Sequence, residues 1–408
     1  MAGTAQHPPR VVITGLGLMS PHGEDPQAVF DRLMAGESAA RPVFPELAKP
    51  AVAATVDFDE SRWFSKLQLA GVDRVSRLAV AAADLAIRDG AALDSVDIDQ
   101  VGLYVGCGMG GGGSLEVAYR HPQMRVPPLT IPAFMPNASA AHIAMRHHLT
   151  GPVLTYSVAC ASSAVALIEA AKAVQRGEVE RAIAGGSEAL VMPGITIAWQ
   201  AMQTLATVDA DDPASSCRPF SADRSGFVIG EGAAFLVLET EASARARGAR
   251  IYAELSGWGM SCDASHLSKP DVAGQTKALR AALRQANVQP ADIGYCNAHG
   301  TATRIGDVVE AQALAAVWGD ALPGLKVSST KALHGHLVGA AGALEALITV
   351  LALQRRQLPP NMHCRQPDPD CPLSLVLQPG HAQPDLEMAM SSSFAFGGTN
   401  AVLILRRH

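Results

Sequence analysis

A cysteine at the start of a small-residue helix is the first candidate for chemistry. The segment Ser157–Ser163 joins the β-rich run Val153–Val158 to an alanine-rich helical stretch, with Cys160 at the junction. Unpaired N–H groups and the helix dipole favour a thiolate at a helix N-terminus, and small neighbours would let an acyl group approach the backbone. A free cysteine is usually a small buried apolar residue. This segment alone therefore supports a nucleophile and a core residue about equally.

A histidine follows a short predicted strand in the second half of the chain. The segment Asn297–Thr303 places His299 among small polar residues. Such a residue lies at the carboxyl edge of the sheet, where α/β proteins bind ligands. The alternative is a loop histidine that hydrogen-bonds its own backbone, and the pattern does not decide between the two.

A lysine and two more histidines lie at a strand-to-helix turn further along. Lys331 and His336 stand five residues apart, and Glu345 falls inside the apolar helix that follows. A buried carboxylate needs a partner, so we expect Lys331 to pair with Glu345. His334 has no neighbour that distinguishes it and is interpreted as a solvated or structural loop residue.

Two glycine turns complete the motifs. The segment Ser393–Asn400 reads as a strand, a Gly397-Gly398 turn and a strand, which is also the pattern of an ordinary β-hairpin. The run Gly106–Gly113 could be mistaken for a nucleotide-binding loop. It lacks the strand–turn–helix spacing and the later acidic residue of that motif, so a nucleotide site is not expected.

Three pairs of similar segments recur in the same order, which indicates a duplicated α/β fold. In the first pair, the helix Arg77–Ile87 and the strand Val101–Val105 match the helix Lys277–Ala286 and the strand Gly294–Asn297. In the second pair, the run Val153–Val158 matches Lys326–Thr330. In the third pair, the strand Phe235–Leu238 matches Ala401–Ile404. We expect an N-terminal half over residues 1–250 and a C-terminal half over residues 251–408. His121–Ala141 and Trp199–Phe220 are predicted to be loops that serve a site or an interface.

Composition narrows the class of protein. Hydrophobic residues make up 48% of the 408 and charged residues 17%, which suits a large buried core. The net charge of −6 argues against a nucleic-acid partner. Seven scattered cysteines without a CxxC pair predict a reducing compartment, hence the cytoplasm. The apolar run Leu337–Leu353 is interrupted by Glu345, so we expect a buried helix rather than a membrane insertion.

Taken together, the four motifs resemble the elongating β-ketoacyl-acyl-carrier-protein synthases of the thiolase-like superfamily. The resemblance runs from Val11–Gly17 to Val402–Leu405 and includes Arg218–Phe220 and Arg224–Gly232. The Cys-His-His set separates elongating enzymes from initiating ones, which carry Asn where His336 stands. The resemblance implies a duplicated thiolase-like fold, layered α/β/α/β/α with two mixed sheets.

The resemblance also implies a decarboxylative Claisen condensation of an acyl chain with a malonyl-type extender. Cys160 would carry the acyl chain, while His299 and His336 would donate N–H groups to the enolate formed by loss of carbon dioxide. The backbone N–H groups of Cys160 and Phe396 would form the oxyanion hole, and Phe396 would gate access to the thioester. Lys331 would hold the electrostatics of the site.

The remaining implied residues support or line the site. Glu345, Thr301 and Thr303 are expected to support it, Met109 is expected to face the acyl chain, and Phe134 is expected to contribute across a dimer interface. No cofactor and no metal is implied, because the substrates arrive on the phosphopantetheine of an acyl carrier protein. Ser392 stands where Asn is common near a cation in some relatives, so a structural ion near Asn297 is not expected.

The resemblance implies an acidic carrier protein as partner, and this chain departs from the family where the carrier would dock. Near Thr207 the family often carries a basic residue, but this chain is acidic there. The basic candidates for docking are Arg62, Lys66, Arg74, Arg77, Arg120 and Arg125, with ordinary solvated charges as the alternative. Ala395 stands where Gly is usual, which would stiffen the gate.

Two other functions within the same superfamily require different residues. A thiolase needs a second cysteine near the C-terminal glycine turn, and the last cysteine here is Cys371. A non-catalytic chain-length factor lacks the nucleophile, whereas this chain carries Cys160 and both histidines. A homodimer and a heterodimer with a chain-length factor both remain open, as do the chain length and whether the product is a fatty acid, a polyketide or a polyene.

Overall fold

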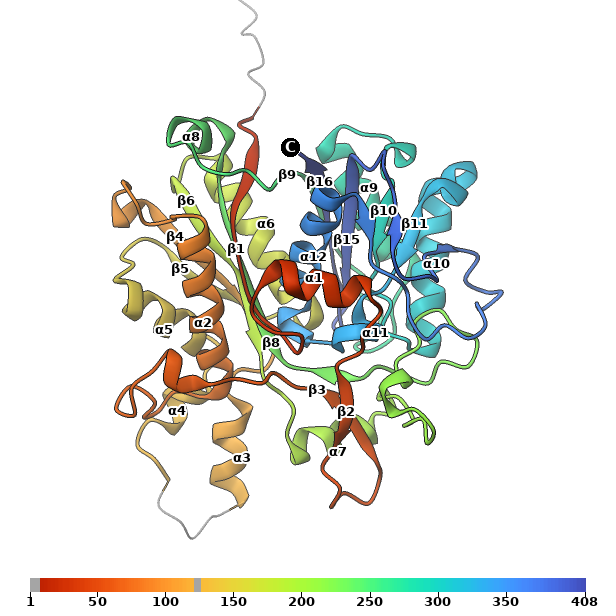
Figure 1. Ribbon diagram of the computed structural model, residues 1–408, viewed down its shortest axis with the longest axis horizontal. Coiled ribbons are helices and arrows are strands. Elements are labelled where there is room, and N and C mark those ends of the chain that lie inside the picture. The colour runs from red at the N-terminus through yellow and green to blue at the C-terminus, as the bar shows by residue number, and fades with distance from the viewer. Residues whose placement is uncertain (1–7, 121–125) are drawn as a thin grey trace, which may run out of the picture.

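The structure is a computed structural model that describes residues 8–120 and 126–408, and a large mixed sheet forms its framework (Figure 1). The N-terminal strands are β1 (Val11–Met19), β4 (Val101–Gly106), β5 (Val153–Tyr156), β6 (Arg181–Glu188) and β8 (Gly232–Thr240). The C-terminal strands are β9 (Ala253–Cys262), β10 (Tyr295–Asn297), β11 (Lys326–Ser328), β13 (Ser374–Leu375), β15 (Met388–Phe394) and β16 (Thr399–Arg407).

The two halves of the sheet repeat one another strand by strand. The order β5-β4-β6-β8-β1 in the first half matches β11-β10-β15-β16-β9 in the second. In each half the first two pairings are parallel and the later two antiparallel. Each predicted pair of strands occupies equivalent positions, which confirms the duplicated fold.

The two expected mixed sheets are continuous along one edge. Strands β1 and β9 pair antiparallel through Val12 with Glu254 and Ile13 with Ala253, so all eleven strands form one hydrogen-bonded sheet. An edge strand exposes unpaired backbone groups, and this short pairing satisfies some of them in both halves.

Helices cover both outer faces and fill the space between the halves. The N-terminal half is covered by α2 (Arg74–Asp89), with α5 (Ala138–His147) packed against α2, and the C-terminal half is covered by α9 (Val272–Ala286), with α10 (Arg304–Trp318) packed against α9. Between them lie α6 (Ser162–Gln175) and α12 (Ala341–Arg355), each packed on its own half and on the other helix. The predicted α/β/α/β/α layering is therefore confirmed.

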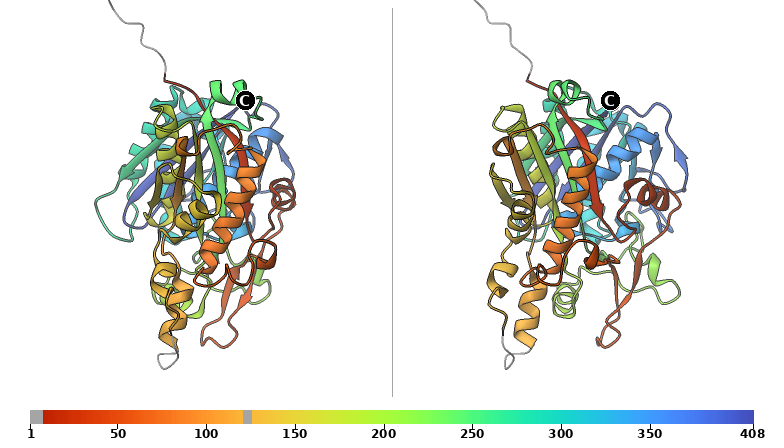
Figure 2. Two further views of the ribbon diagram at one scale, coloured as in Figure 1. Left: turned by 90° about the vertical axis from the view of Figure 1, so that its left-hand side faces the viewer. Right: turned by 60° about the vertical axis from the view of Figure 1, so that its left-hand side comes forward.

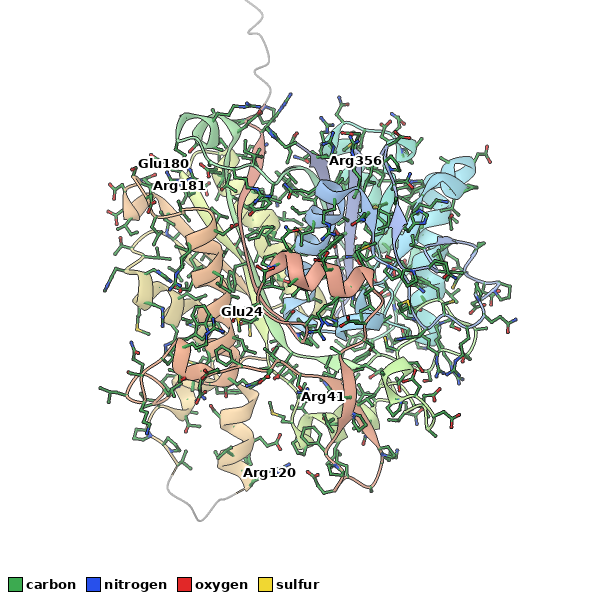
Figure 3. The ribbon with its side chains drawn as sticks, viewed as in Figure 1. Glu24, Arg41, Arg120, Glu180, Arg181 and Arg356 are labelled. Atoms are coloured by element: carbon green, nitrogen blue, oxygen red, sulfur yellow. The ribbon has the colours of Figure 1, made fainter. Side chains whose placement is uncertain are left out.

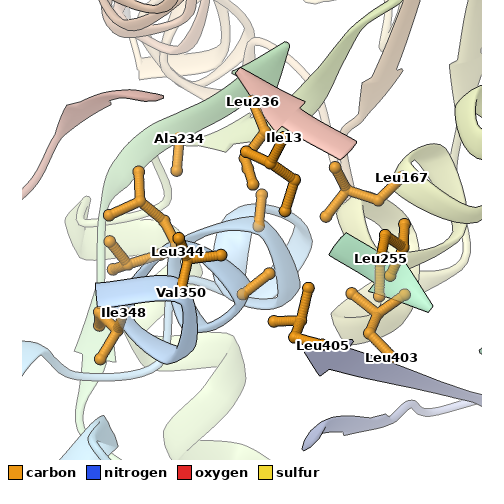
Figure 4. Close-up of a cluster of buried hydrophobic side chains, with 14 of the residues drawn as sticks. Ile13, Leu167, Ala234, Leu236, Leu255, Leu344, Ile348, Val350, Leu403 and Leu405 are labelled. Atoms are coloured by element: carbon orange, nitrogen blue, oxygen red, sulfur yellow. The ribbon is translucent and has the colours of Figure 1, made fainter. Parts of the chain in front are cut away.

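The central helices are rich in alanine because they are enclosed by sheet on two sides. Leu167 from α6 and Leu344 from α12 pack with Ile13, Leu236 and Leu405 from the strands (Figure 4). The stretch Val338–Arg355 is long and apolar enough to cross a membrane, but 89% of that window is buried inside the protein. This burial agrees with the expected core helix.

One end of the molecule carries the additional elements. They are the hairpin of β2 (Ala40–Val43) and β3 (Ala51–Ala54), and the helices α3 (Gly112–Arg120), α4 (Thr130–Phe134) and α7 (Pro193–Ala201) (Figures 1 and 2). Helix α4 and the start of α5 lie within His121–Ala141, so the prediction of a loop there was wrong for the described part. The loop predicted over Trp199–Phe220 begins inside α7, and its remainder is irregular apart from one short 3-10 turn, η4 (Pro213–Ser215).

The remaining elements are short or peripheral. They are α1 (Pro26–Met34), α8 (Glu241–Ala246), α11 (Lys331–His334), β7 (Ile229–Gly230), β12 (Gln357–Leu358) and β14 (His381–Ala382), with 3-10 turns including η3 (Ala159–Ala161) and η7 (Val338–Ala340).

Candidate active site

Cys160 sits where the fold changes from strand to helix. The 3-10 turn η3 carries it directly into the first residue of α6, a few residues after β5 ends. Ala159, just before the cysteine, adopts a left-handed backbone with φ of 48°, a conformation that costs free energy outside glycine. Cys160 is only 7% exposed, yet it lines a large cavity. The structure thus confirms the predicted position at a helix N-terminus.

Both predicted histidines meet the cysteine. His336 Nε2 lies 3.0 Å from Cys160 Sγ. The rings of His299 and His336 stand nearly perpendicular, with centroids 5.5 Å apart. One ligand atom from each of the three residues lies within 4.8 Å of the others. A thiol and two imidazoles this close also resemble the ligands of a zinc site. The geometry therefore does not test the expectation that the site holds no metal, and that expectation stays a prediction.

Burial keeps both imidazoles neutral. Loss of hydration lowers the pKa of His299 and of His336 well below the usual value, and the nearby Lys331 charge lowers both further. Among the described residues, neither Nδ1 atom has a hydrogen-bond partner. Each ring therefore has one N–H to donate to a substrate and no positive charge at neutral pH.

Lys331 and Glu345 form the predicted ion pair, and both are fully buried. Burial raises the pKa of Glu345 to about 7, against the attraction of Lys331. The Lys331 charge also acts on Cys160, where it lowers the pKa of the thiol. The Lys331 charge therefore opposes the effect of burial on the Cys160 thiol, while its role in the reaction stays a prediction.

The thiol itself differs from the expectation of a stabilised thiolate. Burial raises the pKa of Cys160 to about 12, although Lys331 and the backbone N–H of Phe396 lower it. Loss of hydration outweighs the helix N-terminus because the sulfur lies beneath the surface, with little water to solvate a charge. The resting nucleophile is therefore a neutral thiol beside a neutral imidazole.

His334 is structural rather than solvated. Its side chain is buried, Nε2 lies 2.9 Å from Thr330 Oγ1, and Nδ1 lies 2.7 Å from the carbonyl oxygen of Gly335. The solvated part of the interpretation was wrong because other segments of the chain enclose this turn: His22 Nε2 lies 3.2 Å from the carbonyl oxygen of Leu333, and Ala39 N donates to the same oxygen. His334 therefore shapes the turn between Lys331 and His336.

Phe396 closes the site from the side of the hairpin β15–β16. Its backbone N–H donates a hydrogen bond to the Cys160 side chain, which lowers the pKa of the thiol. Its part in an oxyanion hole stays a prediction, because that role requires an N–H directed at the substrate oxygen rather than at the sulfur. Its ring stacks on Trp199, and Phe227 bridges Trp199 to His336. The turn beyond it requires Gly397 and Gly398, which have φ of 85° and 82°.

One cavity of about 810 Å³ connects the surface to Cys160. Thr301 and Thr303 line it with their hydroxyls 3.0 Å apart, so they can offer hydrogen bonds to a substrate arm as well as to each other. Its mouth lies between the loop before β3, the residues after α7 and the loop after β9. The lining extends from the exposed Lys49 at the surface to the buried Cys160.

The predicted acyl-chain residues lie outside this cavity. Met109 is 40% exposed on the glycine-rich loop after β4, and it does not line the cavity. The carbonyl oxygen of Phe134 accepts a hydrogen bond from Gly111 N in the same loop. Contact of either side chain with an acyl chain, or with a partner subunit, stays a prediction.

Three buried carboxylates near the histidines were missed by the sequence reasoning. Glu310 and Asp307 lie on α10, where Glu310 accepts the N–H groups of His299 and Gly300, and Asp307 accepts that of Phe220. Both residues lie on the inner face of an apolar helix, as Glu345 does. That position in the sequence could have predicted that they are buried carboxylates in need of hydrogen-bond donors. Glu188, at the end of β6, is the third.

Ser392, Asn297 and Glu345 surround the place where no structural ion is expected, and that expectation stays a prediction. The hydroxyl of Ser392 donates to Glu310 Oε1, and it accepts the backbone N–H of His299. Asn297 donates to the carbonyl oxygen of Glu345 and accepts from Thr330. These polar groups are satisfied by the protein in the described residues.

The cations predicted to dock a partner are mostly neutralised within the chain. The pairs are Arg62 with Glu24, Arg74 with Glu231, Arg77 with Glu60 and Arg120 with Glu116. Arg120 nevertheless lies on α3 at the end of the molecule that carries the β2–β3 hairpin (Figure 3). Lys66 is exposed, and Arg125 lies outside the described residues.

The rim of the cavity carries cations of its own. Lys49, Lys269 and Arg304 line it, and within residues 8–120 and 126–408 none of them forms an ion pair. No described residue that lines the cavity is acidic, although the whole chain has a net charge of −6. The mouth is thus a local positive region on an acidic protein.

The layered duplicated fold and the Cys-His-His site define a condensing enzyme of the thiolase-like type. The family model described as "Beta-ketoacyl synthase, N-terminal domain" matches residues 9–244, and "Beta-ketoacyl synthase, C-terminal domain" matches residues 252–365. The chain therefore belongs to the β-ketoacyl synthase family, a class of condensing acyltransferases.

Individual relatives agree over almost the whole chain. The 3-oxoacyl-[acyl-carrier-protein] synthase 2 of Staphylococcus aureus (strain N315) is 37% identical, with 98% of each chain covered. The protein of the same name from Rhizobium meliloti (strain 1021) is 38% identical over 98% of this chain and 99% of that protein. The solved ishigamide ketosynthase/chain length factor superposes with a TM-score of 0.91 at 33% identity, covering 98% of this chain and all of the other.

Proposed function

We propose that this chain condenses a Cys160-bound acyl group with the malonyl group of a malonyl carrier protein, releasing carbon dioxide and a β-ketoacyl carrier protein. The observation that carries the proposal is the convergence of Cys160, His299 and His336 at the base of one cavity. The reaction requires no resident cofactor, because decarboxylation itself supplies the carbon nucleophile.

In the first half-reaction Cys160 takes the acyl chain from its carrier. Sγ attacks the thioester carbonyl, a new carbon–sulfur bond forms, and the carrier thiol leaves with the proton of Cys160. His336 Nε2, at 3.0 Å from Sγ, is placed to accept that proton as the sulfur attacks and to return it to the leaving carrier thiolate. The neutral ring can then carry its one N–H on Nε2 for the second half-reaction, because Nδ1 has no partner among the described residues. The N–H of Phe396 contacts Cys160 in the free protein, and in this proposal it turns to the oxygen of the tetrahedral intermediate together with the N–H of Cys160.

In the second half-reaction the extender loses its carboxylate as carbon dioxide. The electron pair of the broken bond forms an enolate, whose oxygen needs hydrogen-bond donors. Two neutral imidazoles supply one N–H each, and a donor of this kind contributes about 10²–10³-fold in rate. The enolate carbon then attacks the acyl-Cys160 carbonyl, the carbon–sulfur bond breaks, and the released thiolate takes a proton from solvent.

The carrier would dock over the cavity mouth. Lys49, Lys269 and Arg304 offer unpaired positive charge, and Leu267 and Ile305 expose apolar surface beside them. An acidic carrier protein with a phosphorylated arm complements this surface in charge. Charge reversal at Lys269 should raise the carrier concentration needed for half-maximal acylation while leaving Cys160 reactive toward a small alkylating agent.

A second chain would pair along the exposed edge of β5. Val153 and Leu154 are exposed there, and Val117, Leu129 and Ile131 of the adjacent α3 and α4 region add further exposed apolar side chains. An unpaired strand edge and exposed apolar side chains both favour association. The partner would be a second copy, or a chain-length factor as named for the ishigamide ketosynthase; either assembly would work in the cytoplasm.

The test is intact-mass analysis of the protein after incubation with acyl carrier proteins bearing chains of different lengths, followed by malonyl carrier protein. We expect a mass increase of one acyl group, which disappears as β-ketoacyl carrier protein forms. Cys160→Ala should show no mass increase but keep its melting temperature, since Ala fits the small site. Cys262→Ala, at an exposed thiol, is the matched control. Normal acylation of Cys160→Ala would contradict the proposal.

A further inference from the structure

Glu188 is a buried carboxylate with no countercharge beside the nucleophile. It ends β6, it is fully buried, and among the described residues no Lys, Arg or His forms an ion pair with it. A bare buried charge is costly unless hydrogen bonds compensate it. Its oxygens must therefore be held by other donors.

Three backbone N–H groups from two separate loops supply those donors. Oε2 accepts from Gly108 N at 2.8 Å and from Gly339 N at 3.0 Å, and Oε1 accepts from Met109 N at 3.3 Å. Gly108 and Met109 belong to the glycine-rich loop after β4, whereas Gly339 belongs to η7. One carboxylate therefore ties these two loops together.

The junction leaves no room for side chains. A Cβ atom on Gly108 would lie 2.5 Å from Glu188 Oε2, and one on Gly339 would lie 2.6 Å from the same oxygen and 2.4 Å from Gly108 N. The two glycines are thus required by the carboxylate that sits between their backbones.

The tied segment includes strained backbone next to a catalytic histidine. Val338, between His336 and Gly339, has φ of 44°, which is a rare conformation for a β-branched residue and persists only where its surroundings enforce it. Val338 packs in the same apolar cluster as Cys160 and Phe227. The hydrogen bond from Gly339 to Glu188 therefore fixes the turn that orients His336 toward the Cys160 sulfur.

We propose that Glu188 is a positioning residue, whose carboxylate locks the His336–Gly339 turn against the Gly108–Met109 loop and so fixes His336 over Cys160. The inference rests on the proposed condensation. It adds a residue that touches neither substrate nor sulfur but determines where one of the two enolate donors points.

The substitution Glu188→Gln tests this positioning role, because Gln has nearly the same shape as Glu but carries no charge and replaces one acceptor oxygen with a donor. The amide oxygen can still accept from Gly108 and Gly339, but its NH₂ group then faces the N–H of Met109, so the junction must shift. We expect the condensation kcat to fall at least about tenfold with little change in KM for the malonyl carrier. Alkylation of Cys160 by iodoacetamide should be no slower than in the wild type, since the charge of Glu188 raises the pKa of that thiol.

The matched control is Glu239→Gln. Glu239, on β8, is also fully buried, and it pairs with Arg181 at the opposite end of β6 from Glu188. It forms ion pairs with Arg181 and Arg247, so its substitution tests the loss of a buried charge away from the site. The Glu239→Gln variant should have a melting temperature lowered at least as much as that of Glu188→Gln, while its condensation kcat stays unchanged. A Glu188→Gln protein with lowered stability but wild-type kcat would overturn the inference, as would an equal loss of condensation and alkylation. Failure of the wild type to condense any donor would instead overturn the proposed function.

Discussion

At the scale of single residues, the site combines a neutral thiol with two neutral histidines around a buried ion pair. Burial is the common cause, because it disfavours every isolated charge that the protein does not pair. Lys331 and Glu345 remain paired, so the cation that lowers the pKa of Cys160 is retained at low cost in solvation. The rate of condensation then depends on the orientation of the histidine N–H groups rather than on the charges of the catalytic side chains.

His336→Asn should damage condensation more than self-acylation. Asn lacks the reach of the imidazole N–H to the enolate oxygen, so we expect condensation to fall by about 10²–10³-fold and acylation by a smaller factor. Single-turnover measurements of each half-reaction provide the comparison. His334→Asn, at the buried histidine of the same turn, should lower stability without changing the ratio of the two rates. Equal losses in both half-reactions for His336→Asn would contradict the division of roles.

The raised thiol pKa predicts a steep pH dependence of alkylation. Because only the thiolate reacts and the pKa of Cys160 is about 12, the rate should rise about tenfold per pH unit from pH 7 to 9 without a plateau. Lys331→Met removes the cation that lowers this pKa, so it should slow alkylation at every pH. Peptide mass mapping separates Cys160 from the exposed Cys262. A plateau below pH 9 would show that the thiolate is stabilised after all.

At the scale of elements, the functional side chains lie where strands end or helices begin. Cys160 precedes α6, His299 follows β10, and Phe396 lies in the β15–β16 turn. Equivalent strands in the two halves therefore bring the nucleophile and the histidines to one place. The loops between these elements, held by Glu188 and Glu310, determine the final geometry.

Met109→Trp tests the glycine-rich loop as a wall of the acyl-chain site. Met109 is partly exposed in the single chain, so a larger ring should change the free energy of unfolding by no more than about 0.5 kcal/mol. Overpacking an acyl tunnel costs about 1–3 kcal/mol, so long donors should acylate Cys160 roughly tenfold or more slowly while short donors are unaffected. Met145→Trp, on exposed α5, is the control. Uniform loss across donor lengths, with a lowered melting temperature, would reject a tunnel role.

At the scale of the whole molecule, the two edges of the eleven-stranded sheet differ. One edge, β5, exposes Val153 and Leu154, and the same half of the chain also exposes Val117 on α3 and Ile131 on α4. The other ends in the two-residue strand β13, which is too short to template another chain. Association is therefore expected at β5 alone.

Leu154→Arg should dissociate the assembly. An unpaired charge buried in the interface costs about 3 kcal/mol or more, which corresponds to at least about a hundredfold increase in Kd. Light scattering after gel filtration would report the mass. Leu377→Arg, beyond the opposite edge, should leave the mass unchanged. A Leu154→Arg protein of undiminished mass would place the interface elsewhere.

Much of this organisation was predictable from the amino-acid sequence. The periodicity of α2 and α9, the strands that precede Cys160 and His299, and the glycine turn after Phe396 each depend on residues close together in the chain. Repetition of these patterns in one order also predicted the duplication. Glu345 within an apolar helix predicted its pairing with Lys331, since a buried charge requires a partner.

Tertiary structure alone decided the rest, because burial and long-range contact are not properties of a local segment. The pKa of Cys160 follows from how deeply α6 is enclosed, which outweighs the helix N-terminus. His334 is buried because segments remote in the sequence, at His22 and Ala39, contact the carbonyl oxygen of the neighbouring Leu333. Arg62 and Arg74 are neutralised by acids 38 and 157 residues away. Glu188 acquires a role only because folding brings Gly108 and Gly339, 231 residues apart, to the same carboxylate oxygen.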